Sequence, residues 1–271
     1  MIIPIEKKVC SWSLMVAFSI LLALITLSVQ AKLQYRVTIL VDGSYPPYSY
    51  LENGKLTGIY VDLVYQAAKL IDDKYSVELQ AVPWKRGLAA LENGDGFALL
   101  PPYKHIKRRP YIWPYSVPLQ EEVVVAFCNR GASLHDIEES DTNAQPLNVG
   151  INAGYVILDE TLEKAIMQGK IRLWENKDTY SNVLKLSKNR IDCYVNDRLS
   201  TLHGLENVKF LHPELDLSNI VEDREVLRRT AHIGYVKDSI NKFPYKHDFI
   251  KQMDEALLIV LARKNAQTVH Q

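Results

Sequence analysis

The feature that most constrains the fold is a regular alternation of short apolar runs with segments of helical periodicity. The first apolar run, residues 35–41, is rich in β-branched side chains and predicts a buried strand. A helix is predicted at 60–70, a strand at 75–82, a proline-initiated helix at 84–92 and a strand at 97–100. Strands and helices that alternate at this spacing predict right-handed βαβ units and a mostly parallel sheet.

The alternation is interrupted by a polar, acidic and irregular stretch at 129–145, and then resumes. Strands are predicted at 121–127, 147–151, 171–174, 190–195 and 231–236, helices at 159–168, 180–188 and 198–203, and a further apolar segment at 208–211. An amphipathic helix at 245–262 ends the pattern, with Phe249, Met253, Ala256, Leu257 and Val260 directed inward. The predicted fold class is α/β, with two Rossmann-like lobes around a central cleft.

The two lobes are expected to be discontinuous in sequence. Lobe 1 comprises residues 32–126 plus 232–271, because the last helix is predicted to return to it, and lobe 2 comprises residues 127–231. The chain then crosses between the lobes twice, and we expect these crossings to act as a hinge.

The first 31 residues have the three parts of a secretory signal peptide. Lys7 and Lys8 precede an uncharged run at 9–29, and small residues occupy positions −3 and −1 of a cleavage site after Ala31. Cleavage would leave the mature protein in the periplasm. The alternative is a retained anchor, because residues 9–29 are long enough to span a bilayer.

Export would leave two cysteines, Cys128 and Cys193, in an oxidising compartment. Such a compartment permits a disulfide between them. Each cysteine also lies in an apolar, strand-like run, which is equally compatible with a free buried thiol. Both interpretations stay open at the level of the sequence.

The composition and motifs exclude several function classes. The 271-residue chain has 32 basic and 32 acidic residues, so a nucleic-acid partner is not indicated. No GxGxxG, P-loop, HExxH or CxxC motif is present. His105 has no companions that would complete a metal-ligand set. We therefore expect no metal and no cofactor.

Two loops carry candidate ligand-binding residues. The first follows the strand at 35–41 and contains Asp42, Tyr45 and Tyr48, in the place where open α/β sheets bind ligands. Asp42 is equally suited to bond its own backbone in the turn before Gly43.

The second loop follows the predicted strand at 97–100, where Pro101 and Pro102 end the ladder. The cations Lys104, Lys107, Arg108 and Arg109 come next, and an aromatic, proline-rich run follows them. A guanidinium offers a planar, two-pronged donor that suits a carboxylate, and neighbouring tyrosines offer stacking faces. The alternative is a solvated basic loop.

Several motifs, in their order and spacing, resemble a known family, the bacterial extracellular solute-binding proteins of family 3, which are type II periplasmic proteins that bind polar amino acids. The motifs are Asp42–Tyr50, Asn53–Gly58, Val61–Leu63, Trp84–Leu91, Gly94–Asp95, Lys107–Arg109, Tyr115–Pro118, Val149–Gly150, Leu184–Leu186, Asn189–Asp192 and Val195–Asp197. The likeness extends from Lys32 to about Lys264 and implies the periplasmic binding protein-like II fold with its hinge.

The resemblance also implies roles for individual residues. Arg109 falls at the position of the family's carboxylate-binding arginine, with Arg108 as an alternative shifted by one residue. Asp197 falls where an acidic residue pairs with the ligand's ammonium group, although it also suits the N-cap of the helix at 198–203. Trp84 and Tyr155 are expected to stack on the ligand.

The sequence departs from the family pattern just before the arginine. Pro101, Pro102, Tyr103 and Ile106 replace the small residue and threonine that donate further hydrogen bonds in the family. Prolines have no backbone N–H, so the ligand need not be a standard α-amino acid.

The leading hypothesis is a secreted, monomeric, non-catalytic protein whose lobes close over a small zwitterion, with Arg109 and Asp197 contributed by opposite lobes. An ABC-transporter permease or a sensor kinase would be its partner. The alternatives are an exported dehydratase on the same fold, which would need a placed acid, and a membrane-tethered sensory module.

Overall fold

The architecture was determined as a computed structural model. It describes residues 34–135, 137–139, 145–237 and 241–269. From Tyr35 onward these residues form one compact unit. The predicted signal peptide at 1–31 lies outside the described residues. No helix in the described ranges is long and apolar enough to cross a membrane.

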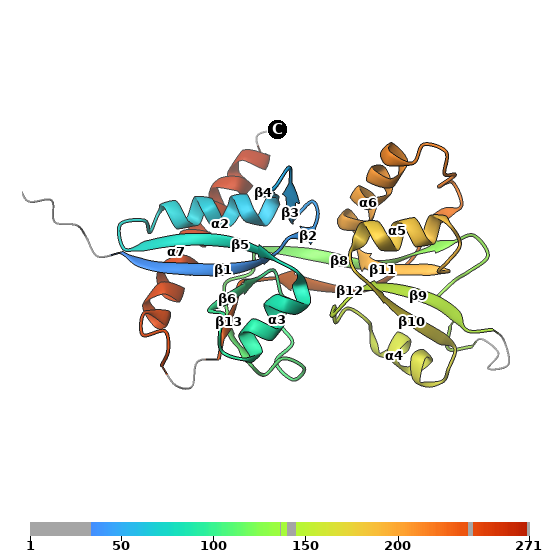
Figure 1. Ribbon diagram of the computed structural model, residues 1–271, viewed down its shortest axis with the longest axis horizontal. Helices are drawn as coiled ribbons and strands as arrows, with labels where there is room; N and C mark the ends of the chain where they lie inside the picture. Colours follow the sequence, from blue (N-terminus) through green and yellow to red (C-terminus); the bar gives the residue numbers. More distant parts are fainter. Residues whose placement is uncertain (1–33, 136, 140–144, 238–240, 270–271) are drawn as a thin grey trace, which may run out of the picture. The chain divides into compact units, whose positions relative to one another are not determined.

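The first sheet contains the predicted βαβ units. Its strand order is β5 (Tyr75–Val82), β1 (Tyr35–Asp42), β6 (Ala98–Leu100), β13 (Gly234–Val236) and β7 (Ile112–Tyr115), and its crossover helices are α2 (Ile59–Lys69) and α3 (Trp84–Glu92) (Figure 1). β1 pairs in parallel with β5 and β6, while β13 runs antiparallel to β6 and β7. Val37, Ile39 and Val41 of β1 are completely buried, which explains the apolar run.

A small three-stranded sheet follows β1 and carries the first predicted ligand loop. Its strands are β2 (Ser44–Tyr45), β3 (Ser49–Glu52) and β4 (Lys55–Thr57). Asn53 and Gly54 join β3 to β4 with φ angles of 50° and 78°, which is the conformation that an Asn-Gly hairpin turn requires. Gly58, at φ 122°, precedes α2, and a Cβ there would lie 2.4 Å from the Tyr48 carbonyl oxygen. Glycine is therefore required where the loop meets the helix.

The second sheet gathers the strands predicted after the interruption. Its order is β10 (Ile171–Asn176), β9 (Leu147–Asn152), β11 (Cys193–Asp197), β8 (Gln120–Asn129) and β12 (Ile220–Ala231), and its helices are α4 (Glu160–Met167), α5 (Thr179–Ser187) and α6 (Arg198–Leu211). β9 is parallel to β10 and β11, and β8 is antiparallel to β11 and β12.

An aspartate begins each helix of the second sheet. Asp159, Asp178 and Asp197 are the N-caps of α4, α5 and α6, and each carboxylate accepts a 2.8 Å hydrogen bond from the backbone N–H three residues on. Such caps stabilise a helix by about 1 kcal/mol because they satisfy an otherwise unpaired donor.

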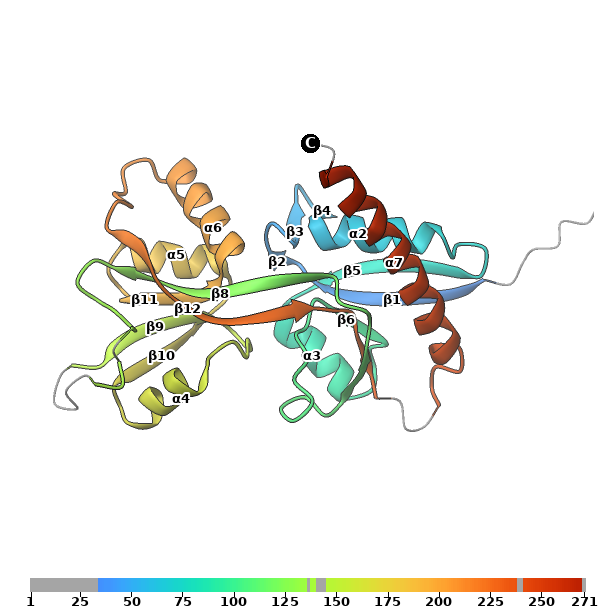
Figure 2. The ribbon, with the colours of Figure 1, turned by 180° about the vertical axis from the view of Figure 1, so that it is seen from behind.

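β8 and β12 link the two sheets. They pair along their whole length, from Asn129 opposite Ile220 to Gln120 opposite Ala231. Figures 1 and 2 show the two strands side by side between the sheets. The chain enters the second sheet along β8 and returns to the first sheet after β12. The lobe boundaries at residues 126/127 and 231/232 stay a prediction.

Several elements differ from the sequence prediction. β7 lies within the aromatic, proline-rich run that was interpreted as part of a loop, and the predicted strand at 231–236 is divided between the last residue of β12 and β13. β12 was not predicted, because its four consecutive charged residues interrupt the apolar alternation that marks a strand: Glu222, Asp223, Arg224 and Glu225. It is an edge strand, and edge strands commonly carry charged side chains. α6 continues to Leu211 instead of ending at 203, so the apolar segment at 208–211 is the last turn of a helix.

The last helix, α7 (Lys246–Val269), lies alongside α2, as Figure 2 shows. Its predicted inward residues are all buried: Phe249, Met253, Ala256, Leu257 and Val260. Phe249 contacts the rings of Tyr75 and Phe97 edge-on. The final helix therefore completes the core of the first sheet, as the sequence predicted.

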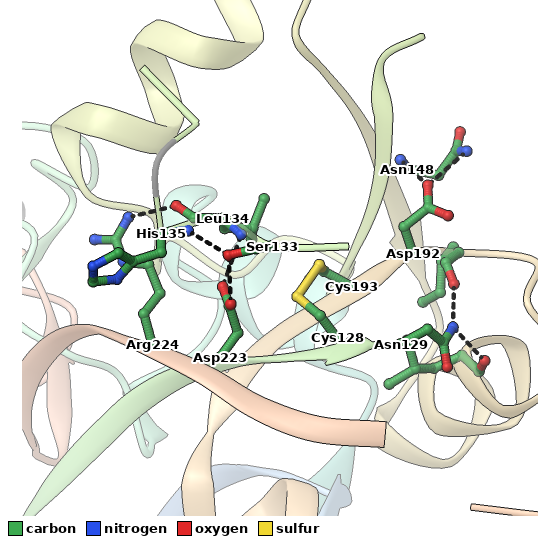
Figure 3. The surroundings of a disulfide bond; sticks show 12 residues. Cys128, Asn129, Ser133, Leu134, His135, Asn148, Asp192, Cys193, Asp223 and Arg224 are labelled. Atoms are coloured by element: carbon green, nitrogen blue, oxygen red, sulfur yellow. Dashed lines mark hydrogen bonds between the residues drawn. A yellow bond between two sulfur atoms is a disulfide. The ribbon is translucent and has the colours of Figure 1, made fainter. Parts of the chain in front are cut away.

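The structure decides between the two interpretations of the cysteines. Cys128 on β8 and Cys193 on β11 stand opposite each other in the antiparallel register and form a disulfide. Both are completely buried. Figure 3 shows the disulfide between two carboxylates, Asp223 and Asp192, which bond backbone N–H groups of the neighbouring segments. The bond spans 65 residues of sequence, which corresponds to about 4 kcal/mol of lost chain entropy in the unfolded state.

Candidate functional site

One cavity collects five of the seven predicted site residues. Its lining comprises Asp42, Tyr45, Trp84, Pro101, Tyr103, His105, Arg109, Tyr155, Val156 and Ile157. About 330 Å³ of space free of protein atoms lies in the cavity and its mouth, part of it open to solvent. The lining comes from the end of β1, from β2, from the start of α3, from the loop after β6 and from the turn after β9. These are the carboxyl ends of strands in both sheets, where α/β folds bind ligands.

Arg109 is the cation of this cavity. Its side chain is buried, and Nη2 donates a 2.8 Å hydrogen bond to the carbonyl oxygen of Gly154. The guanidinium carbon lies 5.4 Å from the centre of the Trp84 ring, and Trp84 Nε1 donates to the same carbonyl at 3.3 Å. No carboxylate forms an ion pair with Arg109 among the described residues. Burial lowers the pKa of Arg109.

Asp42, at the end of β1, is the carboxylate of the cavity. It is 3% exposed. Oδ1 accepts a hydrogen bond from Ser44 N at 3.0 Å, so the turn role considered for Asp42 is present, and Oδ2 accepts one from the Tyr155 hydroxyl at 2.9 Å. Burial raises the pKa of Asp42 to about 6, because few groups replace the water that would solvate its charge.

Aromatic rings form the walls between these two charges. The ring of Tyr155 meets Tyr45 edge-on at 5.7 Å between centroids, and it meets Trp84 edge-on at 5.8 Å. The three residues come from three different elements. Trp84 and Tyr155 therefore line the cavity, where they contact each other and the protein's own charged groups; their stacking on a ligand stays a prediction.

Two predicted site residues, Tyr48 and Asp197, are absent from the lining. The Tyr48 hydroxyl donates a 3.0 Å hydrogen bond to Asp197 Oδ1, and the same oxygen accepts the backbone N–H of Ser200. Asp197 is 2% exposed. The helix-cap role is thus the one observed, and Asp197 is not brought together with Arg109. The carboxylate that shares the cavity with Arg109 is Asp42.

Arg108 occupies a different environment from its neighbour. It is about half exposed and forms an ion pair with Glu163 on α4. Of the two arginines that the sequence left open, Arg109 is the one whose guanidinium reaches the cavity.

Three residues near the cavity were not among the predicted site residues. Glu122 on β8 is 1% exposed and accepts hydrogen bonds from three tyrosine hydroxyls. The sequence feature that could have marked Glu122 as buried is the two-residue alternation along β8, which places it on the same face as the buried Val124 and Ala126. Tyr103 and His105 line the cavity itself. Burial and the nearby Arg109 lower the pKa of His105 to about 4, so its ring is neutral at pH 7.

The sequence matches the bacterial extracellular solute-binding proteins, family 3, over residues 37–258. The chain belongs to this family. No curated protein sequence matches it. Among the residues that the structure describes, no group of three or more His, Cys, Asp or Glu side chains gathers as a metal site in this family 3 protein.

Solved structures of low sequence identity share the fold of this solute-binding protein. A histidine kinase sensor domain with similarity to periplasmic binding proteins is 15% identical, with a TM-score of 0.69, over 88% of this chain and 95% of that chain. An ancestral arginine-binding protein bound to arginine is 16% identical, with a TM-score of 0.66, over 87% and 96%. The arginine-, lysine-, histidine-binding protein ArtJ from Geobacillus stearothermophilus is 16% identical, with a TM-score of 0.62, over 87% and 94%. The predicted periplasmic-binding-protein fold is confirmed.

Proposed function

We propose that this family 3 protein binds a small ligand with a carboxylate at one end and an ammonium group at the other. The supporting observation is the buried Arg109 guanidinium, which has no carboxylate partner among the residues that the structure describes. An unpaired buried charge costs several kcal/mol. A ligand carboxylate in the cavity would supply the missing anion through a charge-assisted, two-pronged contact.

In this proposal Asp42, and not Asp197, receives the ammonium group. Asp42 already accepts the Tyr155 hydroxyl, and an ammonium group would replace or join that donor. Tyr45, Trp84 and Tyr155 would enclose the part of the ligand between the two charges. Both charged groups then come from the first sheet, and Gly154 and Tyr155 close the cavity from the second. This arrangement fits closure about the β8–β12 link.

The proposal includes export and a membrane partner. We propose a cleaved signal peptide at 1–31, a periplasmic monomer with lobe 1 at 32–126 plus 232–271 and lobe 2 at 127–231, and delivery of ligand to an ABC-transporter permease or a sensor kinase. The family description supports an extracellular location. The fold is shared by an amino acid ABC-transporter substrate-binding protein and by a histidine kinase sensor domain. Mass spectrometry of the exported protein should find Lys32 at its N-terminus; an intact residue 1 would favour the anchored alternative.

The proposed role is binding without catalysis. The dehydratase alternative has one observation in its favour, a buried Asp42 whose pKa of about 6 suits a proton donor. An ancestral amino acid-binding protein, described as a precursor of cyclohexadienyl dehydratase, shares the fold at 15% identity. Incubation with a cyclic precursor of an aromatic amino acid should produce no ultraviolet-absorbing product; product that disappears in Asp42→Asn would establish the enzyme.

Calorimetry on Arg109 variants tests the binding proposal. A thermal-shift screen of amino acids, amines and small acids first identifies a ligand, because binding to the folded state raises the apparent stability. Arg109→Ala should then weaken binding about 100-fold, since two charge-assisted hydrogen bonds contribute about 3 kcal/mol together. Arg108→Ala is the matched control and should bind like the unaltered protein. Unchanged affinity in Arg109→Ala would show that the carboxylate site is elsewhere.

A further inference from the structure

Glu122 is a buried carboxylate with no role in the binding mode proposed above. It lies on β8 and accepts hydrogen bonds from Tyr45 on β2, from Tyr60 on α2 at 2.5 Å and from Tyr103 after β6 at 2.5 Å. Through Glu122, a strand of the second sheet is thus hydrogen-bonded to three separate segments that precede it in the chain. No Lys, Arg or His forms an ion pair with Glu122 in the described ranges. Phenolic O–H groups are its only hydrogen-bond donors there.

These hydrogen bonds determine whether the tyrosines of the cavity wall can donate hydrogen bonds to a ligand. Tyr45 and Tyr103 line the cavity, but each hydroxyl has a single proton and gives it to Glu122. The rings are therefore presented to the ligand without a free O–H donor. Tyr60 lies outside the lining and stacks on Tyr48 at 4.8 Å.

The charges around the cavity favour the same kind of ligand. Arg109 is the only lining residue that is cationic at pH 7, because His105 is neutral there. Asp42 lines the cavity, and Glu122 lies directly behind the two tyrosines. A second carboxylate on the ligand would find no donor at these rings and would meet like charges, which weakens its binding. A cationic or flat apolar group would find aromatic faces.

We infer that Glu122 is a positioning residue that sets ligand specificity: by holding the hydroxyls of Tyr45 and Tyr103, it makes the cavity select a cationic or aromatic amino acid against an acidic one. This inference rests on the proposed function, since it requires that the Arg109 cavity bind the ligand carboxylate. Glu122 itself does not contact the ligand.

The test compares the affinities of L-arginine and L-glutamate by calorimetry at pH 8 in the unaltered protein, in Glu122→Gln and in Tyr60→Phe. The groups that face Glu122 are Tyr45, Tyr60, Tyr103 and the carboxylate of Asp197, and the phenols stay protonated at this pH.

We expect the unaltered protein to prefer L-arginine at least tenfold. Glu122→Gln should reduce that ratio to about one third or less, because the amide is neutral and donates a hydrogen bond to one phenol, whose own proton then turns to the cavity.

Tyr60→Phe keeps the test valid if Glu122→Gln does not fold. It removes a hydrogen bond that lowers the pKa of Glu122, so a larger share of Glu122 is neutral at pH 8, and the ratio should fall in the same direction as in Glu122→Gln while the ring surface of the cavity stays the same. Glu121→Gln is the matched control, because Glu121 is exposed, pairs with Arg228 at the surface and should leave the ratio unchanged.

Each outcome separates this inference from the proposed function. A preference for L-glutamate in the unaltered protein would overturn the role of Glu122 and leave the binding function standing. The same would follow if the ratio in Glu122→Gln and Tyr60→Phe equalled that of the unaltered protein. If Arg109→Ala left the binding of these ligands unchanged, the proposed function itself would fail.

Discussion

Asp42→Asn is expected to weaken ligand binding and to stabilise the fold at the same time. Asp42 is 3% exposed, and its pKa is raised by burial from 3.8 to about 6. The folded protein therefore holds a proton on Asp42 at pH values where the unfolded chain has already lost it. Stability consequently falls as pH rises from about 4 to about 6, and at pH 7 the ionised carboxylate costs about 3 kcal/mol.

The raised pKa of Asp42 also determines how much the ligand affinity changes with pH. An ammonium group binds the ionised form of Asp42, and at pH 5 only about one tenth of the free protein is ionised at a pKa of about 6. Affinity for an amino acid should therefore fall about tenfold between pH 7 and pH 5. Arg109 and the ligand's own groups do not titrate in this range, and His105 stays neutral because its pKa is about 4.

Two measurements check this reasoning. Calorimetric titration at pH 5, 6, 7 and 8 should show the loss of affinity in the unaltered protein and a flat profile below pH 6 in Asp42→Asn. Burial raises the pKa of Glu122 to about 7, so Glu122 contributes to the slope only above pH 6. Urea unfolding at pH 7 should show that Asp42→Asn is more stable by about 1–3 kcal/mol, since Asn keeps the bond from Ser44.

The reasoning would be refuted by either of two results. If affinity were the same at pH 5 and pH 7, Asp42 would not hold the ammonium group. If Asp42→Asn lost stability at pH 7, the charge would be compensated in the fold, and Asp42 would be a structural residue. A variant that is more stable but binds less well identifies a carboxylate whose burial serves the ligand.

Two further predictions concern the fold. Replacing Cys128 and Cys193 together by alanine should lower the free energy of unfolding by about 4 kcal/mol in urea, because the bond closes a loop of 65 residues; an unchanged midpoint would show that the bond does not constrain the unfolded chain. Phe249→Ala on α7 should cost about 3–5 kcal/mol by the same assay, because the side chain is completely buried. Leu258→Ala on the same helix is the control, since Leu258 is 55% exposed and should change stability by less than about 0.5 kcal/mol.

Local patterns predicted most of the secondary structure. The apolar run that became β1, the proline that precedes α3 and the apolar face of α7 each depend on residues within a few positions of one another. β12 escaped prediction because it is an edge strand, and exposure to water removes the apolar pattern that marks a buried one.

The candidate site was only partly predictable. Asp42 and Arg109 could be proposed because each follows a strand at its carboxyl end, which is a local property of the sequence. That Asp42, and not Asp197, shares the cavity with Arg109 followed from a hydrogen bond between Tyr48 and Asp197, which lie 149 residues apart. The alternation along β8 could mark Glu122 as buried but could not identify its three tyrosine partners, which lie 77, 62 and 19 residues away.

The sequence by itself determined where strands and helices form and which loops follow the strand ends, because hydrophobic periodicity and capping act over one or two turns of chain. Only the tertiary structure decided which charges meet, whether Cys128 and Cys193 join, and which way the tyrosine hydroxyls point. Those outcomes depend on strand register and on competition among distant partners for the same buried oxygen atoms. Neither strand register nor this competition can be recognised from residues that are neighbours in the sequence.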